Sequence, residues 1–243
     1  MGKNRAYIGT SGWHYSHWEN IFYPADLKKK DQLEFYTSKF TSVELNNSFY
    51  RQPKQENYIT WRDGVPDNFL FAIKANRYFT HLKKLNVTAE ELENFIKSCA
   101  LLGKKLGPIL FQLPPKWKLN LSRLDHFLKL LPKGYQYTFE FRESSWYNLA
   151  VYDLLRKYNC AFCIYHLEGH QSPIITTADF VYVRLHGPEG KYQGKYNPET
   201  LINWKDLIQQ WRTENKKVYF YFDNDQRGFA AMNALDLQAL IKP

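Results

Sequence analysis

Cysteine is scarce in this 243-residue sequence, which has three: Cys99, Cys160 and Cys163. An odd number of cysteines without a signal peptide argues against a disulfide-stapled secreted domain and favours a reducing cytoplasm. The Cys160-x-x-Cys163 spacing resembles half of a metal site, but no second pair completes it. Residues three apart on a strand also face opposite ways. We therefore expect buried thiols and a cytoplasmic protein.

Long apolar runs and linkers are missing as well. No apolar run approaches the roughly 18 residues of a membrane span, so no membrane partner is expected. No low-complexity linker or internal repeat divides the chain. Since α/β barrels of this length are often one domain, residues 1–243 are expected to form a single domain. The aromatic content, in contrast, is high at 17%, which suits a large core and also a pocket that stacks flat ligands or sugars.

Acidic residues are outnumbered, because 33 Lys and Arg oppose 24 Asp and Glu and give a net charge of +9. A basic surface favours anionic partners, including nucleic acid. The lysines lie in short groups, however, which are typical of solvated helix ends and loops. These groups are Lys28–Lys30, Lys83–Lys84, Lys104–Lys105 and Lys216–Lys217.

Eight short apolar runs, each ending in polar residues, predict β-strands. They are Tyr7–Thr10, Ser42–Asn46, Leu70–Lys74, Pro108–Leu113, Gln136–Arg142, Ala161–His166, Phe180–His186 and Lys217–Asn224. Helical patterns lie between most of them. Thr88 and Glu91 form a capping box, Ser122 can cap a helix over Leu124–Leu131, and Pro198 suits a first helical turn. Further helices are predicted over Leu149–Tyr158 and Phe229–Ile241.

Strand–helix alternation predicts parallel strands joined by right-handed crossovers, and eight such units predict an α/β fold of the (β/α)8 TIM-like barrel type. An open doubly wound sheet is the alternative, but no G-x-G-x-x-G turn follows the first strand. The segment between His166 and Asp179 is too short and polar for a good helix. We therefore expect an irregular crossover between the sixth and seventh predicted strands.

The phase of the strands gathers charge inside the predicted barrel. If apolar alternate residues face the helices, the complementary set faces the lumen, and its polar members lie at the carboxyl ends of the strands, where barrel enzymes carry their active sites. The charges balance: Glu44, Glu140 and Asp223 oppose Lys74, Arg142 and Arg184. A self-satisfied network is therefore one reading. A ligand site is favoured, because buried ion pairs stabilise folds poorly.

Three loops should lie above these strand ends. Thr10–Trp18 is rich in rings and hydroxyls, and Asn47–Arg51 follows the second strand. His186–Tyr196 carries glycines and lysines, so it could bind phosphate, act as a mobile lid or be a plain surface loop.

Several chemistries are compatible with these residues. Glu44 and Glu140 could serve as the acid and base of a glycosidase, and His186 could serve as an acid–base group. A Schiff base at Lys74 is disfavoured, since neighbouring carboxylates would keep the amine charged.

A divalent-metal site is a further alternative, for isomerase or phosphoesterase chemistry. Its ligands would come from Glu44, Glu140, His166, His186 and Asp223. The three cationic side chains among these strands would crowd a metal ion, no H-E-x-x-H motif is present, and His166-x3-His170 reads as a loop because it contains Gly169. No cofactor is therefore predicted, although a divalent metal stays open.

The motifs resemble those of the domain-of-unknown-function 72 (YecE-like) family of barrel proteins. The matching stretches are Gly9–Trp13, Val43–Asn46, Phe49–Tyr50, Phe71–Lys74, Thr80–His81, Leu106–Pro108, Phe111–Pro115, Glu140–Arg142, Ser145–Trp146, Val183–Gly187 and Asn224–Asp225. The resemblance covers nearly the whole chain. It implies a single barrel and a pocket built from these residues, but no reaction.

One position departs from that family, which usually reads Phe-Asn-Asn-Asp where this chain has Phe222-Asp-Asn-Asp225. Asp223 is therefore a poor candidate for a shared functional residue, whereas Asn224 carries over.

The sequence thus predicts an enzyme that acts on a small, polar, anionic ligand, phosphorylated or sugar-like, at the carboxyl ends of the strands. The catalytic candidates are Glu44, Glu140 and His186. The candidate ligand-binding residues are Trp13, Asn46, Tyr50, Lys74, Gln112, Arg142, Trp146, Arg184 and Asn224. The alternatives are a non-catalytic module that binds nucleic acid or nucleotide through the basic surface, and the metal-dependent barrel. The oligomeric state cannot be predicted.

Overall fold

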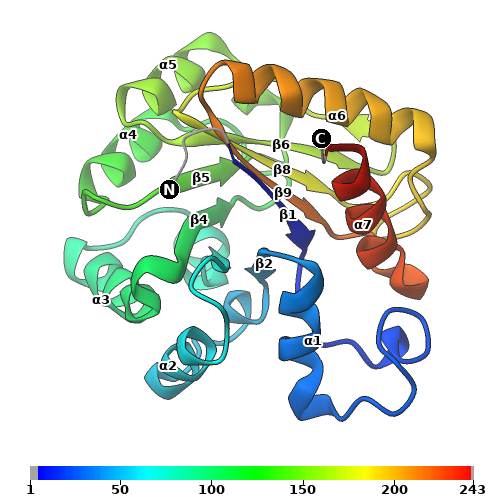
Figure 1. Ribbon diagram of the computed structural model, residues 1–243. Coiled ribbons are helices and arrows are strands. Elements are labelled where there is room, and N and C mark those ends of the chain that lie inside the picture. Colours follow the sequence, from blue (N-terminus) through cyan, green and yellow to red (C-terminus); the bar gives the residue numbers. More distant parts are fainter. Residues whose placement is uncertain (1–4, 242–243) are drawn as a thin grey trace. The chain divides into compact units, whose positions relative to one another are not determined.

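The computed structural model describes residues 5–241 and contains all eight predicted strands (Figure 1). Their bounds are β1 Ala6–Thr10, β2 Ser42–Leu45, β3 Leu70–Lys74, β4 Leu106–Gln112, β5 Tyr137–Glu140, β6 Ala161–Leu167, β8 Phe180–Leu185 and β9 Lys217–Phe222. The sheet order is β1-β9-β8-β6-β5-β4-β3-β2. The predicted fold class is confirmed: the chain is an α/β barrel of mostly parallel strands with flanking helices.

Helices follow most of the strands, as the alternation predicts. They are α1 Gln32–Lys39, α2 Gln55–Asp63, α3 Ala89–Cys99, α4 Leu121–Leu130, α5 Leu149–Lys157, α6 Pro198–Thr213 and α7 Phe229–Ile241. Short helical turns fill the loops: η1 Ser16–Trp18, η2 Lys29–Asp31, η3 Asn47–Phe49, η4 Tyr78–Leu82, η5 Ala100–Lys105, η6 Ser144–Trp146 and η7 Gln226–Gly228. Most are 3₁₀ turns, but η4 is a π-helical turn.

The crossover from β6 to β8 is irregular, as predicted. Instead of a helix it contains β7 (His170–Gln171), which pairs antiparallel with β6 through a tight turn at Glu168 and Gly169. Both turn residues have positive φ, 51° and 76°. The left-handed conformation is easily adopted by glycine, so Gly169 explains why the chain reverses here.

By its internal contacts the chain divides into two compact units. Unit 1 comprises Met1–Glu44, Ile164–Ile174 and Asp179–Pro243, and unit 2 comprises Leu45–Cys163 and Ile175–Ala178. The prediction that residues 1–243 form one domain is not tested by this division and stays a prediction.

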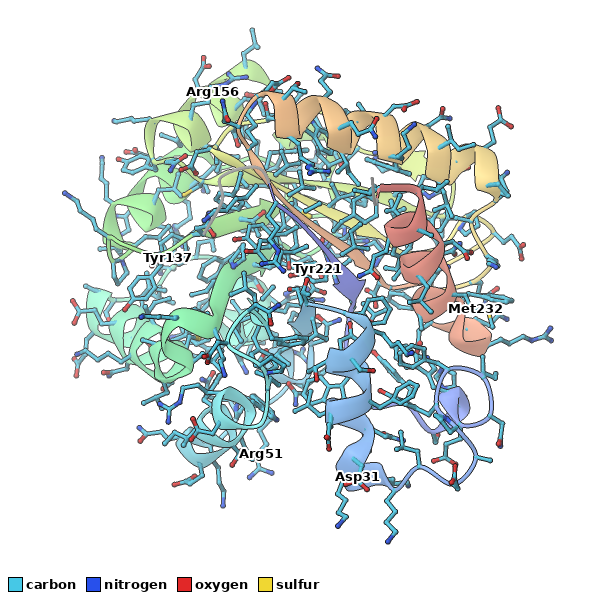
Figure 2. All side chains as sticks on the ribbon, in the orientation of Figure 1. Asp31, Arg51, Tyr137, Arg156, Tyr221 and Met232 are labelled. Carbon is cyan, nitrogen blue, oxygen red and sulfur yellow. The ribbon has the colours of Figure 1, made fainter. Side chains whose placement is uncertain are left out.

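Unit 1 separates its apolar and polar strand faces as the sequence predicts. All six residues of β8 are buried, because neighbours cover both of its faces. On one face, Trp204 of α6 packs against Phe220 of β9, with ring centroids 5.4 Å apart. On the other, Tyr182 packs against Tyr221, with ring centroids 5.3 Å apart, and Tyr221 is fully buried. Figure 2 labels Tyr221 among the side chains of the molecule. Alternate residues of β8 and β9 thus pack on opposite faces of the sheet, one of which faces α6.

Unit 2 has a core made largely of aromatic rings. Phe111 of β4 stacks on Phe139 of β5 with ring centroids 5.4 Å apart, and Phe127 of α4 meets Phe111 edge-on at 5.0 Å. Such pairs are stabilising beyond the area that they bury. Much of the high aromatic content therefore belongs to the core. The three cysteines are free and buried, as expected.

The helix caps confirm one prediction and correct another. Thr88 accepts from the backbone N–H of Glu91 while the Glu91 carboxylate accepts from the backbone N–H of Thr88, which completes the predicted capping box. The prediction that Ser122 caps the next helix is wrong. Helix α4 begins at Leu121, three residues before the predicted start at Leu124, and the Asn120 side chain accepts from Arg123 N at 2.9 Å.

We expect Asn120→Ala to lower the free energy of unfolding by about 1 kcal/mol, because it removes the acceptor of an N-terminal helix N–H. Ser122→Ala, inside the first turn, should change it by less than about 0.5 kcal/mol. Urea denaturation of both variants measures the difference. Equal losses would contradict the assignment of the cap.

Candidate functional site

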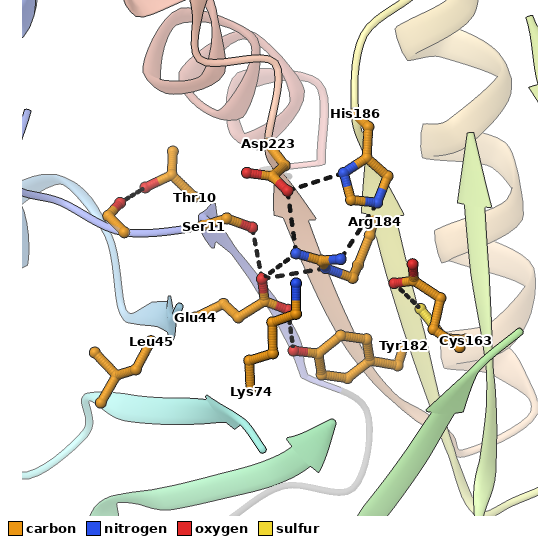
Figure 3. A network of polar contacts seen from close by, with 12 residues as sticks. Thr10, Ser11, Glu44, Leu45, Lys74, Cys163, Tyr182, Arg184, His186 and Asp223 are labelled. Carbon is orange, nitrogen blue, oxygen red and sulfur yellow. Dashed lines mark hydrogen bonds and ion pairs between the residues drawn. The ribbon is translucent and has the colours of Figure 1, made fainter. Parts of the chain in front are cut away.

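Unit 1 brings six polar side chains together at the carboxyl ends of its strands (Figure 3). Parallel pairing aligns these ends, since Phe222 of β9 lies opposite both Thr10 of β1 and Leu185 of β8. An isolated bridge joins Ser11 to Glu44. The six residues, called the unit 1 network below, are Ser11, Glu44, Tyr182, Arg184, His186 and Asp223.

Glu44, a predicted catalytic residue, accepts hydrogen bonds at both carboxylate oxygens. Its Oε1 accepts from Ser11 Oγ at 2.7 Å and from Arg184 Nη2 and Nε at 2.7 and 3.1 Å. Its Oε2 accepts from the Tyr182 hydroxyl at 2.6 Å. Burial and the Glu44 carboxylate both raise the pKa of Tyr182, so this phenol stays protonated and remains a donor. Glu44 is thus held as a compensated, buried anion.

Arg184 connects the strands of the network. Besides its bonds to Glu44, its Nη2 donates to Asp223 Oδ2 at 3.1 Å, and its Nη1 donates to His186 Nε2 at 3.3 Å. Four of its N–H groups therefore point at protein acceptors. The side chain is fully buried. A guanidinium removed from water needs such acceptors, since an unpaired buried charge is very costly.

The contacts of His186 fix its tautomer. Arginine can only donate, so His186 Nε2 must be the acceptor in the contact with Arg184. The proton then lies on Nδ1, which donates to Asp223 Oδ2 at 2.8 Å. Asp223 therefore receives two hydrogen bonds at one oxygen, from Arg184 and His186. At 3.3 Å the contact between Arg184 and His186 is longer, and hence weaker, than the other hydrogen bonds described above.

Asn224, a predicted ligand-binding residue, anchors the loop over residues 187–196. Its Nδ2 donates to Gly194 O at 2.9 Å and to Asn233 Oδ1 at 3.0 Å. Asn233 in turn donates to Tyr196 O at 2.9 Å. The amide donors of Asn224 are therefore used by the protein. Its Oδ1 is buried and has no hydrogen-bond partner in the part of the chain that the structure describes.

A second layer of titratable groups borders this network. Trp18 Nε1 donates to Asp225 Oδ1 at 2.6 Å, and His17 Nε2 lies 3.0 Å from Asp225 Oδ2. Burial raises the pKa of Asp225 to about 6, with a further contribution from Asp223, while His17 and Trp18 act in the opposite direction. The pKa of Tyr15 is raised by burial and then by Asp223, Asp225 and Glu44. Asp225 can therefore change its charge near neutral pH.

His17, Tyr15 and Asp225 are site residues that the sequence does not predict. The loop Thr10–Trp18 is rich in rings and Asp225 belongs to a family motif, but neither signal indicates contact between them. The contact depends on the pairing of β1 with β9, which brings together loops more than 200 residues apart in the sequence.

In unit 2, Glu140 and Arg142 form an ion pair through Arg142 Nε and Glu140 Oε1. Glu140 is fully buried, and Cys163 Sγ lies 3.6 Å from its Oε2. Gln112 of β4 lies opposite Glu140 in the parallel register, and its Nε2 lies 3.4 Å from Leu113 O. Both charged residues thus lie at the carboxyl end of β5, as the strand phase predicts.

Two more predicted ligand-binding residues of unit 2 differ in their surroundings. Lys74 is 8% exposed, and its Nζ lies 4.4 Å from the centre of the Phe49 ring. Asn46 Oδ1 is buried without a hydrogen-bond partner in the described residues. A role for either in ligand binding stays a prediction.

The three aromatic residues predicted to line the pocket, Trp13, Tyr50 and Trp146, differ in their exposure to solvent. Trp13 is half-buried, and its carbonyl accepts from the Tyr23 hydroxyl. Tyr50 is 75% exposed. Trp146 is fully buried and stacks on Phe141, with ring centroids 4.8 Å apart, so its main contacts are those of a core residue.

The histidines named for a metal site, His166 and His186, lie at the ends of neighbouring strands, and His186 N donates to His166 O at 2.9 Å. His166 Nδ1 contacts the Tyr196 hydroxyl at 2.9 Å, and burial, followed by His170, lowers its pKa. Across residues 5–241, no three or more His, Cys, Asp or Glu side chains are grouped so that they could hold a metal ion. In the same range, no helix has both the length and the hydropathy that a membrane span requires.

Comparison with known proteins gives a consistent result. The model of a family described as "Protein of unknown function DUF72" matches residues 7–243. The UPF0759 protein YunF of Bacillus subtilis is 27% identical over an aligned length of 272 residues, and the alignment covers 97% of this chain and 94% of YunF. The UPF0759 protein YecE of Escherichia coli K12 is 28% identical over 142 residues, which cover 58% of this chain and 50% of YecE.

Solved structures agree. A DUF72 family protein from Thermotoga maritima superposes with a TM-score of 0.88 at 28% identity, covering 98% of this chain and 100% of that one. A DUF72 family protein from Enterococcus faecalis superposes with a TM-score of 0.84 at 20% identity, covering 97% and 95%, and supports the fold alone.

We expect Arg184→Met to lower the free energy of unfolding at pH 7 by about 3–5 kcal/mol, because it leaves Glu44 and Asp223 without their buried counter-charge. Urea denaturation measures this loss. Arg156→Met is the control, since Arg156 pairs with Asp153 on the surface of α5 and should contribute less than about 1 kcal/mol. A loss of similar size in both variants would contradict the network.

Asp225 should make stability depend on pH in a defined direction. Because its pKa in the fold is raised to about 6, above the usual value of 3.8, its contribution to stability is present below pH 4 and is lost as the pH rises through 6. Relative to Asp225→Asn, the wild-type protein should lose about 1 kcal/mol between pH 5 and pH 7. Thermal and urea unfolding at both pH values test this, with Asp26→Asn on an exposed loop as the control. A pH-independent difference would refute it.

Proposed function

Because this chain belongs to the DUF72 family, whose members are barrel proteins of unassigned activity, we propose its function from the site itself. We propose an enzyme that binds a small, polar, anionic ligand, phosphorylated or sugar-like, beside the unit 1 network. The reaction would use acid–base chemistry by carboxylate and histidine side chains.

The observation that carries this proposal is the position of the unit 1 network. It places two carboxylates, a guanidinium and an imidazole, all nearly or fully buried, at the carboxyl ends of parallel barrel strands. Hydrophobic side chains of similar volume often stabilise a core equally well or better. The carboxyl ends of the strands are also where barrel enzymes carry out their chemistry. A functional role accounts for both facts.

The residues differ in what they can do. Glu44 accepts four hydrogen bonds and would hold Arg184 in place. His186 Nε2 accepts from Arg184 at 3.3 Å, a long hydrogen bond that a ligand hydroxyl could replace. Asp225, with a pKa near neutrality, is suited to accept or donate a proton, because an acid–base group works best when its pKa lies close to the working pH.

The surrounding loops support a polar, anionic ligand. Lys191 and Arg227 are exposed on the loops that follow β8 and β9. Gln226 N donates to Tyr192 O at 3.1 Å and so ties these two loops together. Trp13 and Tyr192 offer partly exposed rings of the kind that pack against sugars.

The metal-dependent alternative has less support. Arg184 lies between Glu44 and Asp223 and already supplies the positive charge that a cation would bring. The unit 1 network is therefore better suited to a ligand that makes hydrogen bonds than to one that needs free carboxylates.

A thermal-shift screen tests the proposal. At millimolar concentration, at least one sugar phosphate, sugar acid or nucleotide should raise Tm by about 2 °C or more, since a ligand that binds only the folded chain stabilises it. His186→Gln and Asp225→Asn should reduce that shift, whereas Asp26→Asn should not. If no compound of these classes raises Tm, or if both site variants keep the full shift, the proposal is wrong.

A further inference from the structure

Two turns of unit 2 lie against each other and form an exposed surface. They are η3 with the residues up to Lys54, after β2, and η4 with Lys83 and Lys84, after β3. Asn76 Nδ2 donates to Ser48 O at 3.0 Å, and the Phe49 and His81 rings meet edge-on at 5.1 Å. We call these residues, 47–54 and 76–84, the η3–η4 surface.

The η3–η4 surface is strongly basic. Its exposed cationic side chains are Arg51, Lys54, Arg77, Lys83 and Lys84. Burial lowers the pKa of His81 to about 4, and the charges of Lys74 and Arg77 act in the same direction. Of the nearby carboxylates, Glu91 is occupied by Thr88 and Tyr78, while Glu56 is exposed at the start of α2.

The same surface exposes apolar side chains. Tyr50 is 75% exposed and Leu82 is 63% exposed. The edge of the neighbouring Phe49 ring supports Tyr50, with centroids 5.1 Å apart at an interplanar angle of 89°. Leu82 lies at the end of the π-helical turn η4, and Lys83 and Lys84 follow it. Lys84 has a positive φ of 46°. Single π-helical turns are rare and often occur at functional sites.

We propose that the η3–η4 surface binds single-stranded nucleic acid, with a base stacked on Tyr50 and phosphates contacted by Arg51, Lys83 and Lys84. Proteins that bind single strands combine a basic surface with exposed aromatic rings. A projecting ring needs an unstacked base, which a single strand offers and a duplex does not. Binding here does not depend on the chemistry proposed for the unit 1 network, because it uses other residues and another ligand.

Fluorescence anisotropy of the full-length protein with a fluorescein-labelled 20-nucleotide oligo-dT tests this proposal. Binding should weaken steeply between 50 and 200 mM NaCl, because phosphate contacts release counterions. Lys83→Gln combined with Lys84→Gln should weaken binding by about 3-fold or more and reduce the salt slope by about 1. Tyr50→Ala should weaken it by about 5-fold or more, whereas Tyr50→Phe should retain it, because the ring provides the stacking.

The matched control is Lys29→Gln combined with Lys30→Gln, which removes the same charge from an exposed turn of unit 1. Binding by this control at the wild-type level supports the proposal. An equal loss in the control would show that net charge alone is responsible. Absence of binding at 50 mM NaCl, an unchanged affinity in Tyr50→Ala, or binding only to phosphatidylserine vesicles would each overturn the proposal.

Discussion

The burial of the Arg184 guanidinium is the constraint on which the rest of the unit 1 network depends. A guanidinium cannot shed its charge, so once it is removed from water its N–H groups must all find acceptors. Glu44, from the end of β2, and Asp223, from the end of β9, supply acceptors for three of them, and His186 Nε2 supplies another. Ser11 and Tyr182 then complete the hydrogen bonds of Glu44. The parallel register of β1, β9 and β8 is therefore coupled to the electrostatics of one side chain.

The sequence allows most of the fold to be predicted, because alternation of apolar and polar residues is a local property. It identifies every strand of the barrel to within two residues at each end and assigns Glu44, Arg184 and His186 to one face. The sequence does not identify the hydrogen-bond partners of these side chains. The sequence predicts that Arg184 binds an anionic ligand. In the structure, its guanidinium donates hydrogen bonds to Glu44, Asp223 and His186.

Features assembled from distant segments are the ones that the sequence conceals. The contact between Trp18 and Asp225 joins residues that are 207 positions apart in the sequence. The η3–η4 surface takes its cations from residues 51–54 and 77–84, so no single run of lysines indicates it. Of the lysine groups that are visible in the sequence, Lys83–Lys84 belongs to this surface, whereas Lys216–Lys217 is less suitable, since Lys216 is half-buried and paired with Glu214 at 2.6 Å. The contribution of Asp223 is likewise not evident from the sequence. An Asn in its place, as the family resemblance leads one to expect, could accept the same two hydrogen bonds through its oxygen, so the added charge and not the geometry distinguishes this chain.

The loop over residues 187–196 is held by side chains that follow it in the sequence. Asn224 and Asn233 fasten Gly194 and Tyr196, and Asn233 lies on α7, the last helix. During synthesis the ribosome releases this loop before its anchors exist. The loop can take its anchored conformation only after β9 and α7 have docked. The loop that follows His186 therefore cannot be fixed until residues as far along the chain as Asn233 are available.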